Sequence, residues 1–394
     1  MTLSDVGEFT LIDRLASVLG RPSVPGLLLG IGDDAAAWRP TAGAVTVATT
    51  DALVQGVHFD LATTSWTDLG WKALAQNVSD VAAMGCDPCY ALVTLALPPE
   101  VAPADVEALY AGVRECADSY GCAVVGGDVV ASPVVVISIA LIGESLPGVQ
   151  AIGDDPPLLT RSAARAGDVL AVTGALGASA AGLRVLNAAV DPTATPAEQA
   201  AAPHPNPPPQ GGRGFFPSPL TGEGEGGGEA AQETSPASVL VAAHRRPTPR
   251  VGAGRALVKA GVRCAIDVSD GLLADVGHIC ERSGVDAEID ATRVPVHAAA
   301  MARYPEDALE LALTGGEDYE LVCAGPAAAI DRARELLRAV GAPELTVIGK
   351  MLPAGGQPPR VRVRGAAGET IWLDQPGYQH FASAAPNGAT NDNG

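Results

Sequence analysis

Basic residues are scarce in this sequence. Its 394 residues include 25 lysines and arginines against 45 aspartates and glutamates, which gives a formal net charge of −20 at pH 7. Such a surface repels nucleic acids and anionic membranes, so we expect neither as a partner. A phosphorylated ligand could be held only through a few locally placed arginines or lysines, or through bound metal ions.

Long hydrophobic runs are missing as well. The longest, Val134–Ile142, is far too short to span a bilayer and predicts a buried strand. Residues 1–9 carry charges without an apolar core, so we expect no signal peptide. The seven cysteines are an odd number at irregular spacing, which favours reduced thiols in a cytoplasmic protein.

Several catalytic signatures are also lacking. The sequence has no Walker A loop and no nucleophile elbow of a serine hydrolase. Cys86 and Cys89 form a lone C-x₂-C pair without a second pair of ligands, which favours a buried or turn pair over a zinc site. Gly30 and Gly32 lack the third glycine of a dinucleotide-binding motif and instead permit tight turns beside two carboxylates.

The chain is long enough for two domains with full hydrophobic cores. Strand–helix–strand passages predict an N-terminal α/β domain over residues 1–150 and a C-terminal α/β domain over residues 151–382. Residues 191–238, rich in proline and glycine at their centre, predict a disordered insert between two helices. A flexible polar tail is expected over residues 383–394.

The spacing of apolar residues predicts the individual elements. We expect helices over residues 7–20, 66–85, 103–120, 239–260, 272–283 and 327–340. Strands are expected over residues 90–97, 122–130, 134–143, 167–173, 285–289 and 345–348, with a short strand leading into residues 265–271.

The sequence does contain a series of acidic turns, each at the end of an expected strand or helix. The stretch Thr49–Asp51 presents two hydroxyls and a carboxylate, which are hard oxygen ligands that suit Mg²⁺. Any one such turn is more often a solvated turn or a helix cap. Together they predict one anionic, metal-filled site, since clustered carboxylates repel one another until a divalent cation binds. The other turns contain Asp33-Asp34, Ser79-Asp80, Gly127-Asp128 and Asp267-Val268-Ser269-Asp270.

Two further positions bear on this site. Asp80 falls near the C-terminal end of its expected helix, where the helix dipole disfavours a carboxylate by up to about 1 kcal/mol, a conflict that a bound cation would relieve. His58, seven residues after Asp51, fits a satisfied core histidine and a substrate contact equally well. The turn Gly174–Ser179 likewise leaves open simple packing or phosphate binding at a helix N-terminus.

Seven blocks together resemble the signature blocks of bacterial thiamine-monophosphate kinases: GIGDDAAAW, TTDALVQGVHFD, WKALAQNVSDVAAMG, VVGGD, LTRSAARAGDVLAVTG, IDVSDGLLADVGHI and GGEDYELV. They occur in that family's order and cover nearly all of the chain except the insert. The resemblance implies a two-domain aminoimidazole ribonucleotide synthetase-like α/β (α+β) fold with the nucleotide between the domains. It also implies a homodimer joined through the N-terminal sheets, and ATP-dependent phosphorylation of thiamine monophosphate to thiamine diphosphate.

The resemblance further implies roles for individual residues. Metal ligation would fall to Asp34, Thr49, Thr50, Asp51, Asp80, Asp128, Asp267 and Asp270. Gly127, Asp128, Arg161 and Ser269 would contact ATP, and His58, Glu317 and Tyr378 would contact the thiamine substrate. Asp51, Asp128 and Arg161 would carry the catalysis.

The expected reaction is direct in-line transfer of a phosphoryl group, assisted by several Mg²⁺ ions. The attacking phosphate oxygen is already ionised at neutral pH, so no strong general base is required. Two alternatives remain: another ATP-using enzyme of the same superfamily, or a non-catalytic regulator that binds metal or nucleotide.

Overall fold

A computed structural model describes residues 2–20, 24–149, 157–190, 235–356, 358–373 and 377–378. Most of the predicted insert and all of the predicted tail lie outside these residues. Helix α7 begins at Pro236, so residues 236–238 are helical and do not belong to the insert as predicted. Within the described residues, no helix is both long and apolar enough to cross a membrane.

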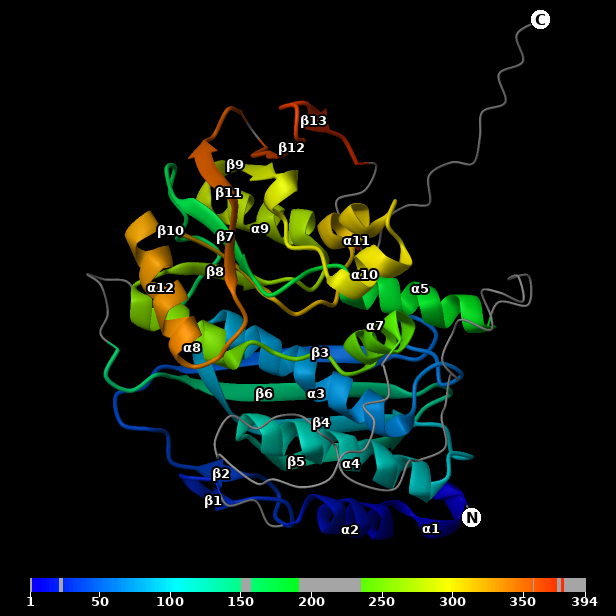
Figure 1. Cartoon of the computed structure of the whole chain (residues 1–394). Helices are drawn as coiled ribbons and strands as arrows, with labels where there is room; N and C mark the ends of the chain where they lie inside the picture. Colours follow the sequence, from blue (N-terminus) through cyan, green and yellow to red (C-terminus); the bar gives the residue numbers. More distant parts are fainter. Residues whose placement is uncertain are drawn as a thin grey trace, which may run out of the picture.

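The N-terminal part of the chain is built on a four-stranded sheet in the order β3-β6-β4-β5, drawn in the lower half of Figure 1. Its strands are antiparallel except for the parallel pair β4–β5. Helices α3 and α4 cover one face. The bounds are β3 Thr46–Val54, β4 Cys86–Leu97, β5 Ala123–Ala131, β6 Val136–Ser145, α3 Trp66–Ala83 and α4 Pro103–Tyr120.

A small hairpin and two helices lie at the β5 side of this sheet (Figure 1). Strands β1 (Leu27–Leu29) and β2 (Ala37–Trp38) pair with each other, and Trp38 stacks on Tyr90 of β4 with ring centroids 4.8 Å apart. Helix α2 packs on α4. The bounds of the two helices are α1 Leu3–Val6 and α2 Glu8–Leu19.

Helices α3 and α4 touch through their backbones. A Cβ atom on Gly70 of α3 would lie 1.9 Å from the carbonyl oxygen of Leu109 on α4, and one on Gly112 would lie 1.8 Å from the carbonyl oxygen of Thr67. No side chain fits at either contact. The glycines therefore let the two helices pack as one layer against the sheet.

The sheet has two different faces because successive side chains of a strand point to opposite sides. On β6, Ile137, Ile139 and Leu141 are buried beneath the helices, whereas Ser138 and Ala140, on the opposite face, are partly exposed. The position of any residue in β3 or β5 relative to α3 therefore follows from the strand register.

The C-terminal part of the chain contains a seven-stranded sheet in the order β13-β12-β9-β11-β7-β10-β8, in the upper half of Figure 1. Every pair is antiparallel except β9–β12. Separate hydrophobic cores form around α9 and around the pair α8–α12. The strands are β7 Val169–Thr173, β8 Cys264–Asp267, β9 Val285–Asp290, β10 Leu321–Gly325, β11 Leu345–Pro353, β12 Val361–Arg364 and β13 Thr370–Ile371.

A third apolar cluster joins α5, α7, α10 and α11. The helices of this part of the chain are α5 Ala178–Val190, α7 Pro236–Arg245, α8 Val251–Ala260, α9 Leu272–Ser283, α10 Ala298–Arg303, α11 Ala308–Thr314 and α12 Ala327–Ala339, with a short 3₁₀ helix over Ala291–Arg293. The mixture of helix and sheet in two layered units matches the predicted fold class.

The single helix predicted over residues 239–260 is wrong, because α7 and α8 are separated by residues 246–250. Pro247 and Pro249 fall in this gap, and proline cannot donate the backbone hydrogen bonds of a helix interior. The connecting segment instead crosses α3. The indole Nε1 of Trp71 donates to the carbonyl oxygen of Pro247 at 2.8 Å, and the Arg246 guanidinium lies 4.4 Å from the Trp71 ring centroid. This segment therefore ties the two parts of the chain together.

Candidate active site

An acidic cluster forms where β3, the C-terminal half of α3 and the end of β8 meet. Asp51 comes from β3, Asp80 from α3 and Asp267 from the last position of β8. The Thr49 hydroxyl donates to Asp80 Oδ2 at 2.5 Å, and the Ser79 hydroxyl donates to Asp267 Oδ2 at 2.7 Å. The contact between Ser79 and Asp267 connects the two parts of the chain, and four predicted metal ligands, Thr49 among them, lie around one region.

The backbone of the cluster is held by its own hydrogen bonds. The Asp51 amide donates to Asn77 Oδ1 at 3.1 Å, and the Asn77 side-chain amide donates to the Ala73 carbonyl at 3.0 Å. Asn77 therefore links β3 to α3 at the level of the carboxylates. Asn77 is three residues before Asp80, so the two side chains lie on the same face of the helix.

The electrostatics of the cluster favour cation binding. Burial, and then the charges of Asp80 and Asp270, raise the pKa of Asp51 to about 6. Burial and the neighbouring Asp80 also raise the pKa of Asp267 well above its ordinary value. Burial raises the pKa of Asp80, against the opposing effects of the Thr49 hydrogen bond and Arg161. Ionising all three carboxylates is therefore costly without a compensating positive charge, and their hard oxygen donors suit Mg²⁺.

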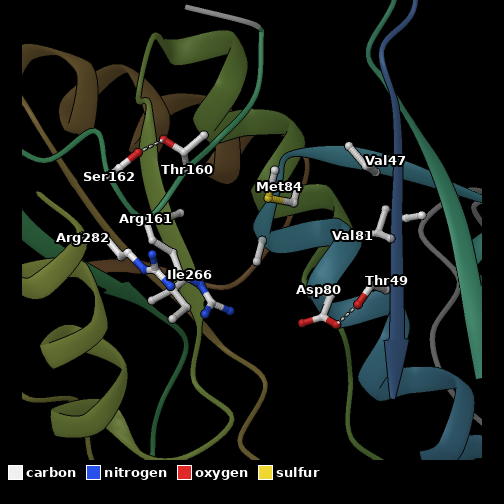
Figure 2. Close-up of a pocket in the computed structure, with 13 residues that line it drawn as sticks. Val47, Thr49, Asp80, Val81, Met84, Thr160, Arg161, Ser162, Ile266 and Arg282 are labelled. Carbon is white, nitrogen blue, oxygen red and sulfur yellow. Dashed lines mark hydrogen bonds between the residues drawn. The ribbon is translucent and has the colours of Figure 1, made fainter. Parts of the chain in front are cut away.

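A cavity of about 450 Å³ opens beside the cluster, between β3 and α3 on one side and residues 160–162, β8 and α9 on the other. Figure 2 shows Thr49 and Asp80 on one wall and the guanidinium groups of Arg161 and Arg282 on the opposite wall. The Ser162 hydroxyl donates to Thr160 Oγ1 at 3.5 Å on the arginine side. In this acidic protein, these two arginines supply the local positive charge that a phosphate group requires.

The loop that carries Ser269 and Asp270 is held in place by Asp275. The Asp275 carboxylate accepts the backbone N–H groups of Ser269 at 3.1 Å, Asp270 at 3.2 Å and Gly271 at 3.1 Å. Asp270 in turn accepts the backbone N–H of Tyr378 at 3.0 Å through its carbonyl oxygen. Predicted residues for metal, ATP and substrate thus meet at one loop, whose shape depends on a buried carboxylate that the sequence analysis did not single out.

A second polar group surrounds Glu317, next to the acidic cluster. The Glu317 amide donates to the Ser269 carbonyl oxygen at 2.8 Å, and its carboxylate pairs with Lys72 of α3 at 2.9 Å. Burial opposes ionisation of Glu317, but Lys72 and His244, and to a smaller degree His58, hold the pKa of its carboxyl below the ordinary range. His58 is itself oriented by the Val54 amide, which donates to His58 Nδ1 at 3.0 Å. Two of the predicted substrate residues therefore lie close enough to interact.

Asp128 and Gly127 lie away from the acidic cluster within one chain. Asp51 pairs with Ile139, Ile139 with Val93, and Val93 with Gly127, so Gly127 is three strands away, or roughly 14 Å at about 4.8 Å per strand. Asp128, the next residue, is exposed and its side chain faces away from α3. Within one chain, strand order therefore separates Asp128 from the other predicted carboxylates.

Two more predicted ligands are also separated. Thr50 lies between Thr49 and Asp51 in β3, so its hydroxyl is on the opposite face of the sheet from theirs. Asp34 lies in the loop between β1 and β2, at the β5 side of the sheet in Figure 1, whereas the cluster is at β3. Gly127, the residue before Asp128, is packed too closely to carry a side chain, since a Cβ there would lie 1.9 Å from the Val93 carbonyl oxygen.

The sequence analysis missed several residues that shape this region. Lys72 and His244 contact Glu317, and Arg282 lines the cavity. Tyr319 is buried, and burial raises the pKa of its hydroxyl above the ordinary value. The charges of Glu317, Asp267 and Asp51 raise this pKa further. A lysine within the apolar stripe of the predicted helix 66–85 was a usable signal, whereas His244 and Arg282 sit in ordinary helical surroundings and gave none.

Comparisons with known proteins cover almost the whole chain. Residues 32–145 match the family model described as AIR synthase related protein, N-terminal domain, and residues 219–361 match the corresponding C-terminal domain. The thiamine-monophosphate kinase of Escherichia coli K12 is 33% identical over 383 residues, covering 96% of this chain and 99% of that protein. The enzyme of the same name from Mycobacterium tuberculosis H37Rv is 34% identical over 394 residues, covering 98% and 96%.

Solved structures agree with the sequence comparisons. The crystal structure of thiamine-monophosphate kinase from Stenotrophomonas maltophilia K279a has a TM-score of 0.70 and 34% identity, covering 94% of this chain and 99% of that one. The structure of AaThiL complexed with AMPPCP and TMP has a TM-score of 0.63 and 30% identity, covering 97% and 99%. The predicted family and fold are therefore confirmed.

Proposed function

Since the chain belongs to the family of thiamine-monophosphate kinases, we propose that it transfers the γ-phosphoryl group of ATP to thiamine monophosphate, giving thiamine diphosphate and ADP. The observation that carries this function is the cavity with the Asp80 side of the acidic cluster on one wall and Arg161 and Arg282 on the other. A similar protein has been solved in complex with AMPPCP and TMP. AMPPCP is a nucleotide analogue, and TMP is the abbreviation of thiamine monophosphate.

The oxygen donors of the cluster fit Mg²⁺, and Asp51, Asp80, Asp267 and Asp270 would hold it, with Thr49 beside them. Bound there, Mg²⁺ would offset the charge between two phosphate-bearing reactants that otherwise repel each other. Arg161 binds the ATP phosphates from the opposite wall of the cavity, where its planar guanidinium can donate hydrogen bonds to two phosphate oxygens at once. Ser269 contacts the nucleotide from the loop that Asp275 holds.

The transfer proceeds in line. A terminal phosphate oxygen of thiamine monophosphate attacks the γ-phosphorus of ATP, the bond from that phosphorus to the β,γ-bridging oxygen breaks, and ADP leaves. The attacking oxygen is already ionised, so catalysis consists of positioning and charge neutralisation, without a general base. Glu317, His58 and Tyr378 hold the thiamine moiety beside the acidic cluster.

We further propose a homodimer formed through the sheet face that points away from α3 and α4. This face carries Thr50, Ala140 and Asp128, and Val130 beside it is 46% exposed. A second copy packed there would bring its own Asp34, Gly127 and Asp128 toward the nucleotide, which their separation within one chain otherwise prevents.

All seven cysteines are unpaired, consistent with work in the reducing cytoplasm.

The test is formation of thiamine diphosphate by the purified protein. Incubation with ATP, Mg²⁺ and thiamine monophosphate should yield thiamine diphosphate and ADP in equal amounts, and EDTA should stop both. If ADP forms only when another acceptor from a substrate panel is added, and no thiamine diphosphate forms, the protein is a different enzyme of the superfamily. Nucleotide binding without any turnover would indicate a regulator. Analytical ultracentrifugation of the same preparation tests the dimer, and a monomer at assay concentrations would contradict it.

A further inference from the structure

Lys72 is a buried lysine that joins the two parts of the molecule. It lies on α3, its side chain is 2% exposed, and its ammonium group reaches Glu317 in the loop before β10 at 2.9 Å. A buried ammonium group is costly unless it is paired and hydrogen-bonded. A residue of the helix that also carries Asp80 therefore depends on one substrate residue of the other domain.

His244 extends this pair into a hydrogen-bonded chain. Lys72 Nζ lies 3.4 Å from His244 Nε2, and since an ammonium group can only donate, Nε2 must accept. Burial and the Lys72 charge lower the pKa of His244 to about 3, so the ring is neutral and its single proton is on Nδ1. Nδ1 lies 3.3 Å from Glu317 Oε2 and 3.0 Å from the Ser179 hydroxyl.

The backbone conformation and the exposure of Glu317 show why its carboxylate needs these contacts. Its φ angle is +64°, a left-handed conformation that strains residues other than glycine. Both of its carboxylate oxygens lie 2.9 Å from Lys72 Nζ, and its side chain is still 29% exposed, so the carboxylate is held by Lys72 and remains accessible on its exposed side. The Glu317 amide donates to the Ser269 carbonyl oxygen at 2.8 Å, so Glu317 lies beside the loop that carries the predicted ATP and metal residues.

We propose that Lys72 is a positioning residue for thiamine monophosphate, acting through Glu317. This inference rests on the proposed function. Lys72 and His244 fix the orientation of the carboxylate, so that its exposed side can accept a hydrogen bond from the exocyclic amine of the pyrimidine or face the thiazolium cation. Both groups of the thiamine moiety complement an ionised, oriented carboxylate, whereas the phosphates of ATP do not.

The test compares Lys72→Met, Glu317→Gln and the double variant with the wild-type enzyme, measuring kcat, the KM for each substrate and the Tm. Lys72→Met should raise the KM for thiamine monophosphate about tenfold or more, because a buried charge-assisted hydrogen bond is lost. The KM for ATP should stay within about twofold, since Lys72 acts on the other substrate. In the Glu317→Gln background, Lys72→Met should add less than about twofold, because the carboxylate it positions is gone.

A matched control separates positioning from simple destabilisation. Val113→Ala removes fully buried volume from α4, the helix packed on α3, and should lower the Tm without changing the KM for thiamine monophosphate. If Lys72→Met does not fold, Glu317→Gln can still be compared with the double variant, which removes both charges. That comparison decides whether Lys72 acts through Glu317. The proposal is overturned if Lys72→Met changes the KM values of both substrates equally, or raises the KM for thiamine monophosphate as much without Glu317 as with it. A wild-type enzyme that forms no thiamine diphosphate would instead refute the proposed function.

Discussion

Replacing Asp51 by asparagine should abolish most activity and yet stabilise the metal-free protein. The substitution removes one negative charge from the acidic cluster but keeps the size of the side chain. The Asp51 backbone amide, which donates to Asn77 at 3.1 Å, is unaffected. Loss of a proposed Mg²⁺ ligand should lower kcat roughly a hundredfold or more, in the range found when one preorganised charge-stabilising contact is removed.

The size of the stabilisation follows from the pKa of Asp51. Burial and the nearby Asp80 and Asp270 raise it from 3.8 to about 6. A shift of one unit corresponds to about 1.4 kcal/mol, so the ionised carboxylate costs the folded protein up to about 3 kcal/mol above pH 6. Partial access of water reduces this, and we expect Asp51→Asn to gain about 1–2 kcal/mol in the free energy of unfolding.

The pH dependence has a definite sign. A carboxyl whose pKa is raised in the folded state contributes stability below the unfolded value of 3.8, and that contribution is lost as the pH rises through about 6. The advantage of Asp51→Asn over the wild type should therefore be full above pH 6 and shrink as the pH falls toward 4.

Urea unfolding in EDTA at pH 7.5 and pH 4.5 measures this difference. Asp118→Asn is the control, because its side chain is 71% exposed on α4 and its ion pair with Arg114 at 3.5 Å is a surface pair; it should change stability by less than about 0.5 kcal/mol. An Asp51→Asn protein that is equally stable or less stable than the wild type at pH 7.5 would show that the carboxylates do not strain the metal-free fold. Wild-type turnover of this variant at limiting Mg²⁺ would remove Asp51 from the metal site.

Two further substitutions test other parts of the structure. Arg161→Met should raise the KM for ATP about tenfold or more while changing the KM for thiamine monophosphate much less, because it removes a guanidinium from the cavity wall opposite Asp80; steady-state kinetics with each substrate varied would show this, and equal effects on both would contradict it. Gly70→Ala should destabilise the protein by at least about 1–3 kcal/mol in urea unfolding, because its Cβ would lie 1.9 Å from the Leu109 carbonyl oxygen. Gly277→Ala, in α9 with open space around it, should instead be neutral or slightly stabilising, and a loss equal to that of Gly70→Ala would refute the contact argument.

Local sequence determined much of the secondary structure. Helices α4 and α9 have the bounds predicted from apolar spacing, and each is followed by a glycine in the left-handed conformation, Gly121 and Gly284. Prolines mark where the prediction failed. Pro247 and Pro249 lie inside the helix predicted over residues 239–260, and their lack of a backbone N–H divides it into α7 and α8.

The candidate site was predictable only as far as local patterns reach. Asp267 ends β8 and Asp80 lies in the last turn of α3, as predicted for an anionic site at element ends, but Asp51 lies in the middle of β3 and not in a turn after a strand. The distance of Asp128 from them depends on the strand order β3-β6-β4-β5, which no local pattern records. The partnership of Lys72 with Glu317 joins residues 245 positions apart, so only the tertiary fold reveals it.

Strand β3 places two sets of residues under separate constraints. Thr49 and Asp51 face α3 and the acidic cluster, while Ala48, Thr50 and Ala52 face the other side. Deleting or inserting a single residue ahead of Thr49 would exchange the two sets at once, turning alanines toward the acidic cluster and a carboxylate toward the proposed dimer face. Evolution can therefore vary the loops on either side of this strand in length, but within it only point substitutions leave both surfaces usable.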